Sequence, residues 1–218
     1  MKKFLAITFA SFGLTALLVS INNKAPNSIV GFNPKGKKIV FIGDSMTAGY
    51  GWGWQSVMAK IYQFIEVNLA VGGKRTDWML VTLQRYLTTD TCDAVFIYGG
   101  ANDAYSAVSN NTAIANVQKM VDLCVSKNIK PFVVVGYDPM KVSYGRVALT
   151  KYVTTRVEMD KLTTKYAQQQ QMTKSIKNAK IIPMWTNCSK VDSADGLHLN
   201  ASAQKRFAEY VGKEAFGY

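Results

Sequence analysis

Short apolar runs, rich in β-branched and aromatic residues, recur along this chain, and a stretch with helical periodicity separates each run from the next. Uninterrupted apolar strands that alternate with helices are typical of a parallel sheet buried on both faces. The pattern therefore predicts an α/β protein, a three-layer α/β/α sandwich with five parallel strands and right-handed crossovers. The expected strands cover residues 38–42, 65–71, 94–98, 132–135 and 180–184, and the expected helices cover 54–64, 76–87, 112–127, 144–176 and 201–215.

The 218 residues suit one domain, which we place at 37–218, after a polar linker at 23–36. Residues 1–22 contain Lys2 and Lys3 followed by an uncharged apolar stretch. A basic start followed by an apolar segment is typical of a signal peptide, and the length also allows a retained N-terminal membrane anchor. We therefore expect a protein that is exported, periplasmic or secreted, or anchored in the membrane by this segment.

The formal net charge is +12, but the basic residues are scattered and no nucleic-acid-binding motif is evident. We expect no nucleic-acid partner. A solvated basic surface is the simpler interpretation, and attraction to anionic polysaccharide, envelope or lipid headgroups is the alternative. Cys92, Cys124 and Cys188 are odd in number and widely spaced, which predicts neither a disulfide framework nor a metal site. We expect no metal and no cofactor, and we expect Cys92 and Cys124 to be buried.

His198 is the single histidine of the chain. Only histidine has an unperturbed pKa near neutrality, so any imidazole base must be this residue. Asp195 precedes it by three positions, in a loop that leads into the last predicted helix. In this arrangement the aspartate can orient the imidazole and stabilise its protonated form. Alternatively, the two residues are an N-cap aspartate and an ordinary loop histidine.

Three predicted strands end in residues that suit acyl transfer. Ser45 follows the first strand, Gly73 the second and Asn102 the third. Each has an ordinary alternative: a serine N-cap, a glycine turn and an Asn-Asp turn. Together with Asp195 and His198, however, they meet at one edge of a parallel sheet. A nucleophile, a base, an orienting carboxylate and donors for an oxyanion are what acyl transfer requires.

The sequence resembles the SGNH or GDSL hydrolases. Gly43-Asp44-Ser45-Met46 is similar to the first sequence block of that family, Gly73 falls where the second block has its glycine, and 100–103 and 195–198 match the third and fifth blocks. The resemblance covers about 37–215. One departure follows the histidine, where Ser202 and Ala203 occupy a region in which many members have a glycine. This affects local helix packing more than chemistry.

The resemblance implies a flavodoxin-like sheet and the following roles. Ser45 attacks an ester carbonyl, His198 transfers the proton, and Asp195 orients the imidazole. The backbone N–H groups of Ser45 and Gly73 and the side chain of Asn102 would form the oxyanion hole. Asp44 and Asp103 are expected to brace their loops. A serine hydrolase of this kind needs no cofactor.

Substrate-contacting residues are harder to predict. Tyr50 and Trp52 lie among glycines after Ser45 and suit either a sugar-stacking platform or the core, and Trp54 suits the core better. Tyr105 and Tyr137 follow the third and fourth strands and are expected to line the site. We expect the Lys-, Thr- and Gln-rich stretch at 150–178, including 168–171, to form an exposed helix.

The expected function is a serine esterase that removes acetyl groups from an extracellular or envelope glycan. A lysophospholipase or acyl-thioesterase acting on lipids is the alternative, and a non-catalytic binding or virion protein of the same fold is a third. The expected partner is thus an acylated glycan or a lipid, and membrane association would depend on the N-terminal segment.

Overall fold

The computed structural model describes residues 31–49, 53–143, 156–195 and 197–217. The expected N-terminal segment at 1–22 and residues 23–30 of the expected linker lie outside these ranges. Within them, no helix combines the length and the apolar character needed to cross a membrane.

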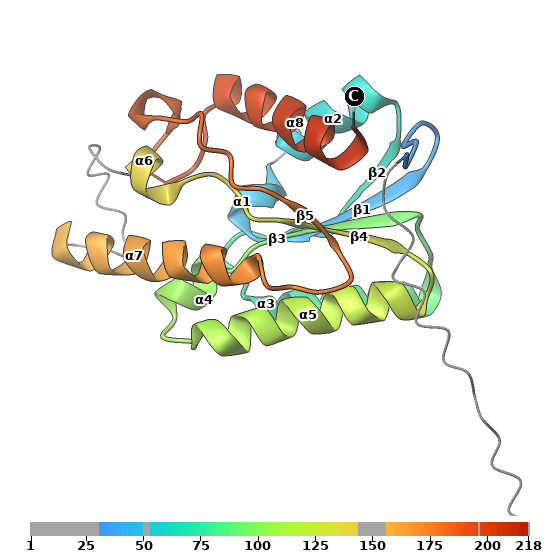
Figure 1. Cartoon of the computed structure of the whole chain (residues 1–218), viewed down its shortest axis with the longest axis horizontal. Helices are drawn as coiled ribbons and strands as arrows, with labels where there is room; N and C mark the ends of the chain where they lie inside the picture. The colour runs from blue at the N-terminus through green and yellow to red at the C-terminus, as the bar shows by residue number, and fades with distance from the viewer. Residues whose placement is uncertain (1–30, 50–52, 144–155, 196, 218) are drawn as a thin grey trace, which may run out of the picture.

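The described chain forms one sheet of five parallel strands with helices on both faces, which confirms the predicted fold class (Figure 1). The strand order is β2-β1-β3-β4-β5, so the chain moves outward from β1 in both directions. Because all the strand pairs are parallel, the carboxyl ends of the strands lie at the same edge of the sheet. The strands are β1 (Lys38–Gly43), β2 (Ile65–Asn68), β3 (Ala94–Tyr98), β4 (Lys130–Val134) and β5 (Lys180–Ile182).

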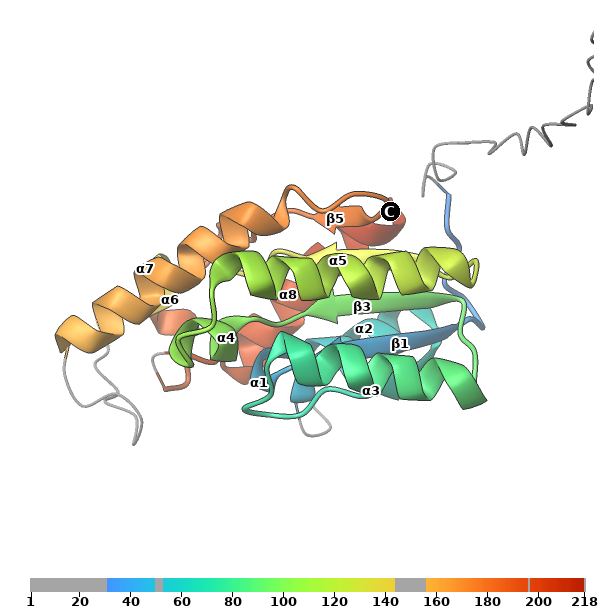
Figure 2. The same ribbon diagram turned by 90° about the horizontal axis from the view of Figure 1, so that it is seen from below.

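Helices α2 and α8 cover one face of the sheet, and α3 and α5 cover the other (Figures 1 and 2). Helix α7 contacts α4, α5 and α6 near the carboxyl edge. The helices are α1 (Ser45–Ala48), α2 (Trp54–Tyr62), α3 (Thr76–Thr89), α4 (Ala101–Tyr105), α5 (Asn110–Ser126), α6 (Pro139–Ser143), α7 (Arg156–Thr173) and α8 (Ala201–Phe216), with a 3-10 turn, η1 (Lys190–Asp192).

Most predicted boundaries differ from the structure by one or two residues, and two of them differ by more. The strand expected over 65–71 ends at Asn68, because the side chain of Asn68 accepts the backbone N–H of Ala70 (3.0 Å) and turns the chain. The helix expected over 144–176 is described from Arg156 to Thr173, and 144–155 lie outside the described residues. The short helices α1, α4 and α6 were not predicted, since one turn of helix has no detectable periodicity.

The strands bury alternate residues against the two helical layers. Phe41, Phe96 and Phe132 are register partners on β1, β3 and β4 and face the layer of α2 and α8. Their rings stack across the sheet with centroids 5.1 and 4.5 Å apart. Val40 and Ile42 face α3 and α5. Burial on both faces explains why polar residues do not alternate along these strands.

Helix α7 corrects one prediction. The stretch at 168–171 was expected to be exposed, but Gln169 and Gln170 are only 2% and 3% exposed, whereas Gln168 and Gln171 are exposed. Gln170 Nε2 donates to the carbonyl oxygens of Val135 and Tyr137 at 2.8 and 3.1 Å. These carbonyls follow β4, where the chain leaves the sheet and needs other donors. The glutamine face of α7 therefore satisfies backbone groups at the strand ends.

Replacing Gln170 by leucine should lower the free energy of unfolding by about 2–5 kcal/mol, because two buried carbonyls would each lose a donor. Urea titration of Gln170→Leu measures the loss. Gln171→Leu is the matched control on the exposed face and should change stability by no more than about 0.5 kcal/mol. Equal effects of the two substitutions would contradict the assigned role of Gln170.

Candidate active site

The turn after β1 is held by close packing and by a cap. A β-carbon on Gly43 would lie 2.3 Å from the Tyr98 carbonyl oxygen, so a side chain there would push β1 and β3 apart. Asp44 caps α1 by accepting the Met46 N–H through Oδ1 (2.9 Å). Ser45 is the first residue of α1 and is partly accessible, at the carboxyl edge of the sheet.

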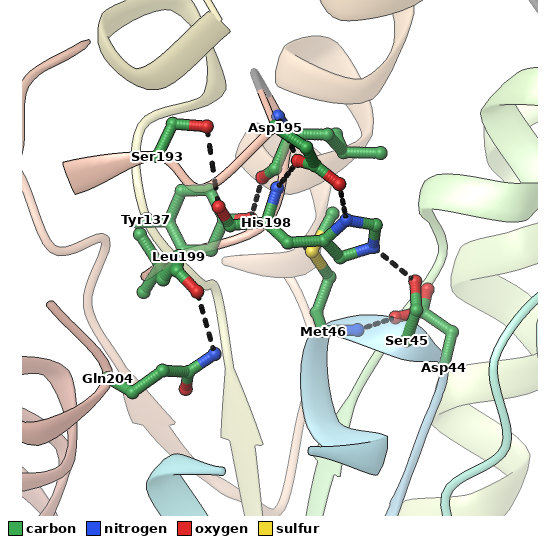
Figure 3. A network of polar contacts seen from close by, with 10 residues as sticks. Asp44, Ser45, Met46, Tyr137, Ser193, Asp195, His198, Leu199 and Gln204 are labelled. Atoms are coloured by element: carbon green, nitrogen blue, oxygen red, sulfur yellow. Dashed lines mark hydrogen bonds and ion pairs between the residues drawn. The ribbon is translucent and has the colours of Figure 1, made fainter. Parts of the chain in front are cut away.

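The loop before α8 forms a compact unit around Asp195. Its Oδ1 accepts the backbone N–H groups of Leu197 and His198 at 2.9 and 2.8 Å. Its Oδ2 lies 2.7 Å from His198 Nδ1, and His198 Nε2 lies 2.9 Å from Ser45 Oγ (Figure 3). The structure therefore brings Ser45, His198 and Asp195 together in one hydrogen-bonded chain. With Asp195 ionised, Nδ1 carries the imidazole proton, and Nε2 is free to accept from the serine hydroxyl.

The negative charge of Asp195 and the positive charge of a protonated His198 stabilise each other. Partial burial acts to raise the pKa of Asp195, but the hydrogen bonds from the His198 ring and from two backbone N–H groups outweigh it and hold that pKa well below its usual range. The bond to Asp195 raises the pKa of His198 above its ordinary value, against the opposing effect of burial. The imidazolium is therefore stabilised in the place where a proton taken from Ser45 would be held.

Asp44 is a second carboxyl group near the imidazole. Complete burial raises its pKa to about 6, although the Met46 N–H and the charge of His198 both favour the ionised form. Asp103 has a related structural task, because its oxygens accept the backbone N–H and the hydroxyl of Thr76 at 3.0 and 2.7 Å. Both aspartates thus brace their loops as expected.

The glycine turn after β2 lies against the serine. A β-carbon on Gly72 would be 3.7 Å from Ser45 Cβ, and Gly73 is exposed with φ +78°. Asn102 Nδ2 donates one hydrogen bond to the Lys74 carbonyl (3.2 Å), which ties α4 to this turn and leaves its second N–H for another acceptor. Within the described residues, the backbone N–H groups of Ser45 and Gly73 have no acceptor.

The predicted substrate-contacting residues have different outcomes. Tyr50 and Trp52 lie outside the described residues. Tyr137 is 2% exposed, and its hydroxyl donates to the Leu197 carbonyl beneath the histidine loop. It lines a small cavity together with Tyr105, and its contact with substrate stays a prediction. Tyr105 is half-buried and lines a small cavity of ≈10 Å³ next to Leu197. Its contact with substrate stays a prediction.

Trp54 is fully buried as expected, and its indole N–H donates to the Met46 carbonyl (3.1 Å). Cys92 and Cys124 are buried free thiols, also as expected. Two features near the site were not predicted from the sequence. Gln169 fills the space that a side chain on Gly100 would need. Trp78 of α3 packs against the core and is half-buried at an open groove next to Gly73. Of these features, only the positive φ of Gly100 (+110°) has a signal in the sequence, because glycine is the residue that adopts positive φ most readily.

Comparison with known proteins identifies the family. Residues 41–206 match the model of the GDSL-like Lipase/Acylhydrolase family. An arylesterase from Vibrio mimicus is 26% identical over 187 residues, which cover 82% of this chain and 88% of that protein. A member of the lipolytic protein G-D-S-L family from Veillonella parvula has a similar fold, with a TM-score of 0.65 at 18% identity over 83% of this chain and 98% of the other. An acetylxylan esterase from Geobacillus stearothermophilus has a TM-score of 0.65 at 13% identity over 85% and 95%.

The fold and the family match define a carboxylic ester hydrolase. More narrowly, the chain belongs to the GDSL-like Lipase/Acylhydrolase family. The expectation of a non-catalytic binding or virion protein is therefore set aside. The two structural similarities, at under one-fifth identity, show the shared fold alone.

The acid limb of kcat/KM with p-nitrophenyl acetate should have its midpoint above pH ~6.5, the ordinary pKa of histidine. A His198 that acts as the general base must be neutral to accept a proton, and its raised pKa keeps it protonated to higher pH, so we expect activity to be lost as pH falls through that pKa. Asp44→Asn removes a negative charge that raises the pKa of His198, and should move the limb to lower pH.

Asp122→Asn is the control for this profile, because Asp122 is exposed on α5. Its acid limb should coincide with that of the unsubstituted protein. A limb that stays in place in Asp44→Asn would contradict the electrostatic coupling between Asp44 and the imidazole.

Proposed function

We propose that this protein is a serine esterase in which Ser45 is the nucleophile, His198 the general base and acid, and Asp195 the orienting carboxylate. One observation carries the proposal: Ser45 Oγ, the His198 ring and Asp195 Oδ2 form a continuous chain with separations of 2.9 and 2.7 Å. These distances are within hydrogen-bond reach for proton transfer.

The geometry supports the following steps. As Ser45 Oγ bonds to the ester carbonyl carbon, its proton moves to His198 Nε2, and the imidazolium is stabilised by Asp195. The tetrahedral intermediate then breaks its bond to the alcohol oxygen, which takes the proton from Nε2 as it leaves. Water attacks the resulting acyl-serine, again giving a proton to Nε2, and collapse of that intermediate releases the acid and restores the serine.

Donors for the negative oxygen are available beside Ser45. The backbone N–H groups of Ser45 and Gly73 and the second N–H of Asn102 have no acceptor among the described residues. We assign the oxyanion hole to these three groups. The bond from Asn102 to the Lys74 carbonyl fixes the amide and the Gly73 turn relative to each other before substrate binds, which is the preorganisation that such a site needs.

For the substrate, we propose the acetyl ester of a glycan outside the cytoplasm. We assign the acyl group to the cavity beside Tyr105 and Leu197, whose volume of ≈10 Å³ leaves room for about one water-sized group and suits a methyl group better than a long chain. The named similar proteins include an arylesterase and an acetylxylan esterase. The basic, then apolar residues 1–22 support export or membrane anchoring as part of the same proposal.

Ser45→Ala and His198→Ala should lose nearly all turnover of p-nitrophenyl acetate, by about 10⁴-fold or more, because nucleophile and base act as a unit. Ser56→Ala, on α2 at a partly buried position bonded to Glu66, is a control serine that should keep the activity. Wild-type rates in either catalytic variant would overturn the serine mechanism.

The acyl group is tested with p-nitrophenyl esters of two to twelve carbons and with acetate release from acetylated xylan. We expect kcat/KM to be highest for acetate and to fall steadily with chain length. A preference for acyl chains of eight or more carbons would overturn the proposed deacetylase activity and favour the lysophospholipase or acyl-thioesterase alternative.

Asn102→Leu should lower kcat by about 10²–10³-fold, the usual effect of losing one oxyanion donor, with a smaller change in KM. Asn111→Leu, at an exposed position on α5, provides the matched control. A variant at Asn102 that changes KM alone would remove this side chain from the oxyanion hole.

A further inference from the structure

An open groove of ≈530 Å³ lies directly beside the glycine turn of the site. It is lined by Gly73, Lys74 and Arg75 of the glycine turn and, from α3, by Asp77, Trp78 and Val81. Val81 is 52% exposed and adds an apolar surface to the groove. The proposed mechanism uses Gly73 but leaves the rest of this groove without a role.

The groove has one uncompensated positive charge. Arg75 pairs with Asp77 at 2.7 Å, and these two charges offset each other. Lys74 Nζ instead lies 5.4 Å from the centre of the Trp78 ring, which holds the ammonium over the groove. Within the described part of the chain, no carboxylate pairs with Lys74.

Lys74 is also physically joined to the proposed oxyanion hole. It follows Gly73 directly, and its carbonyl accepts the hydrogen bond from Asn102 (3.2 Å). A negative group held by the ammonium would therefore lie on the same substrate unit as the reacting ester, or on the adjoining unit. The net charge of +12 would draw an anionic polymer toward this surface from a distance.

We propose that the groove beside Gly73 binds a carboxylate-bearing sugar, such as a uronic acid, of an acylated acidic glycan. The inference rests on the proposed esterase function and narrows its substrate. The single free charge of Lys74 matches a singly charged carboxylate, and the apolar surfaces of Trp78 and Val81 suit the C–H face of a pyranose ring.

The test uses acetylated oligogalacturonides and the same oligosaccharides with their carboxyl groups methyl-esterified, with acetate release as the readout for both. The unsubstituted protein should have a higher kcat/KM on the charged substrate. Lys74→Met should lower the ratio of charged to neutral kcat/KM by about 3–10-fold, as expected for one partly exposed charge pair. Lys74→Arg should restore most of that ratio, because it restores the charge.

Lys127→Met is the control for general charge, since Lys127 is exposed at the opposite end of the sheet, and its ratio should equal that of the unsubstituted protein. Equal kcat/KM values on the two substrates, or equal losses in the Lys74 and Lys127 variants, would overturn the assignment of the groove. Failure to hydrolyse even p-nitrophenyl acetate would instead overturn the proposed esterase function, so the two failures are distinguishable.

Discussion

The close approach of the ends of β1 and β3 is the constraint on which the candidate site depends. Gly43 lies opposite Tyr98 in the register, and a β-carbon there would lie 2.3 Å from the Tyr98 carbonyl oxygen. That same oxygen accepts the hydroxyl of Thr47, so the first turn of α1 is fastened to β3. Ser45 lies within this fastened turn, and the stacked phenylalanines behind it prevent the strands from separating.

A hydrogen bond also connects the proposed oxyanion donors to the groove beside Gly73. Asn102 lies in the first turn of α4, the helix after β3, and its side chain holds the turn that follows β2 through the Lys74 carbonyl. Two strand ends on either side of β1 are thereby linked above Ser45. In the proposed mechanism, the groups that stabilise the oxyanion and the groups that select the substrate share one backbone segment, so a change in one alters the position of the other.

The sequence predicted the sheet and the residues at its carboxyl edge because both depend on local patterns. Strands buried on both faces are apolar throughout, Ser45 and Asn102 each follow such a strand in a short motif, and His198 lies in a short motif before the last helix. The buried glutamines of α7 could not be predicted in this way. Gln169 packs against Gly100, and Gln170 donates to backbone carbonyls far away in the sequence. A helical pattern of polar residues gives no sign of such partners. The groove beside Trp78 could not be predicted for a related reason, since the amphipathic pattern of α3 does not show which apolar side chains also line a groove.

The hydrogen bond between Ser45 and His198 joins residues that are 153 positions apart. Asp195 and His198 form their own compact loop through bonds within four residues, but this loop reaches Ser45 only when α8 has packed onto the sheet. During synthesis, the serine emerges among the first elements and its partners among the last. By the proposed mechanism, a nascent chain whose α8 has not yet packed onto the sheet therefore has no hydrolytic activity, and ester cleavage begins only once this domain has folded.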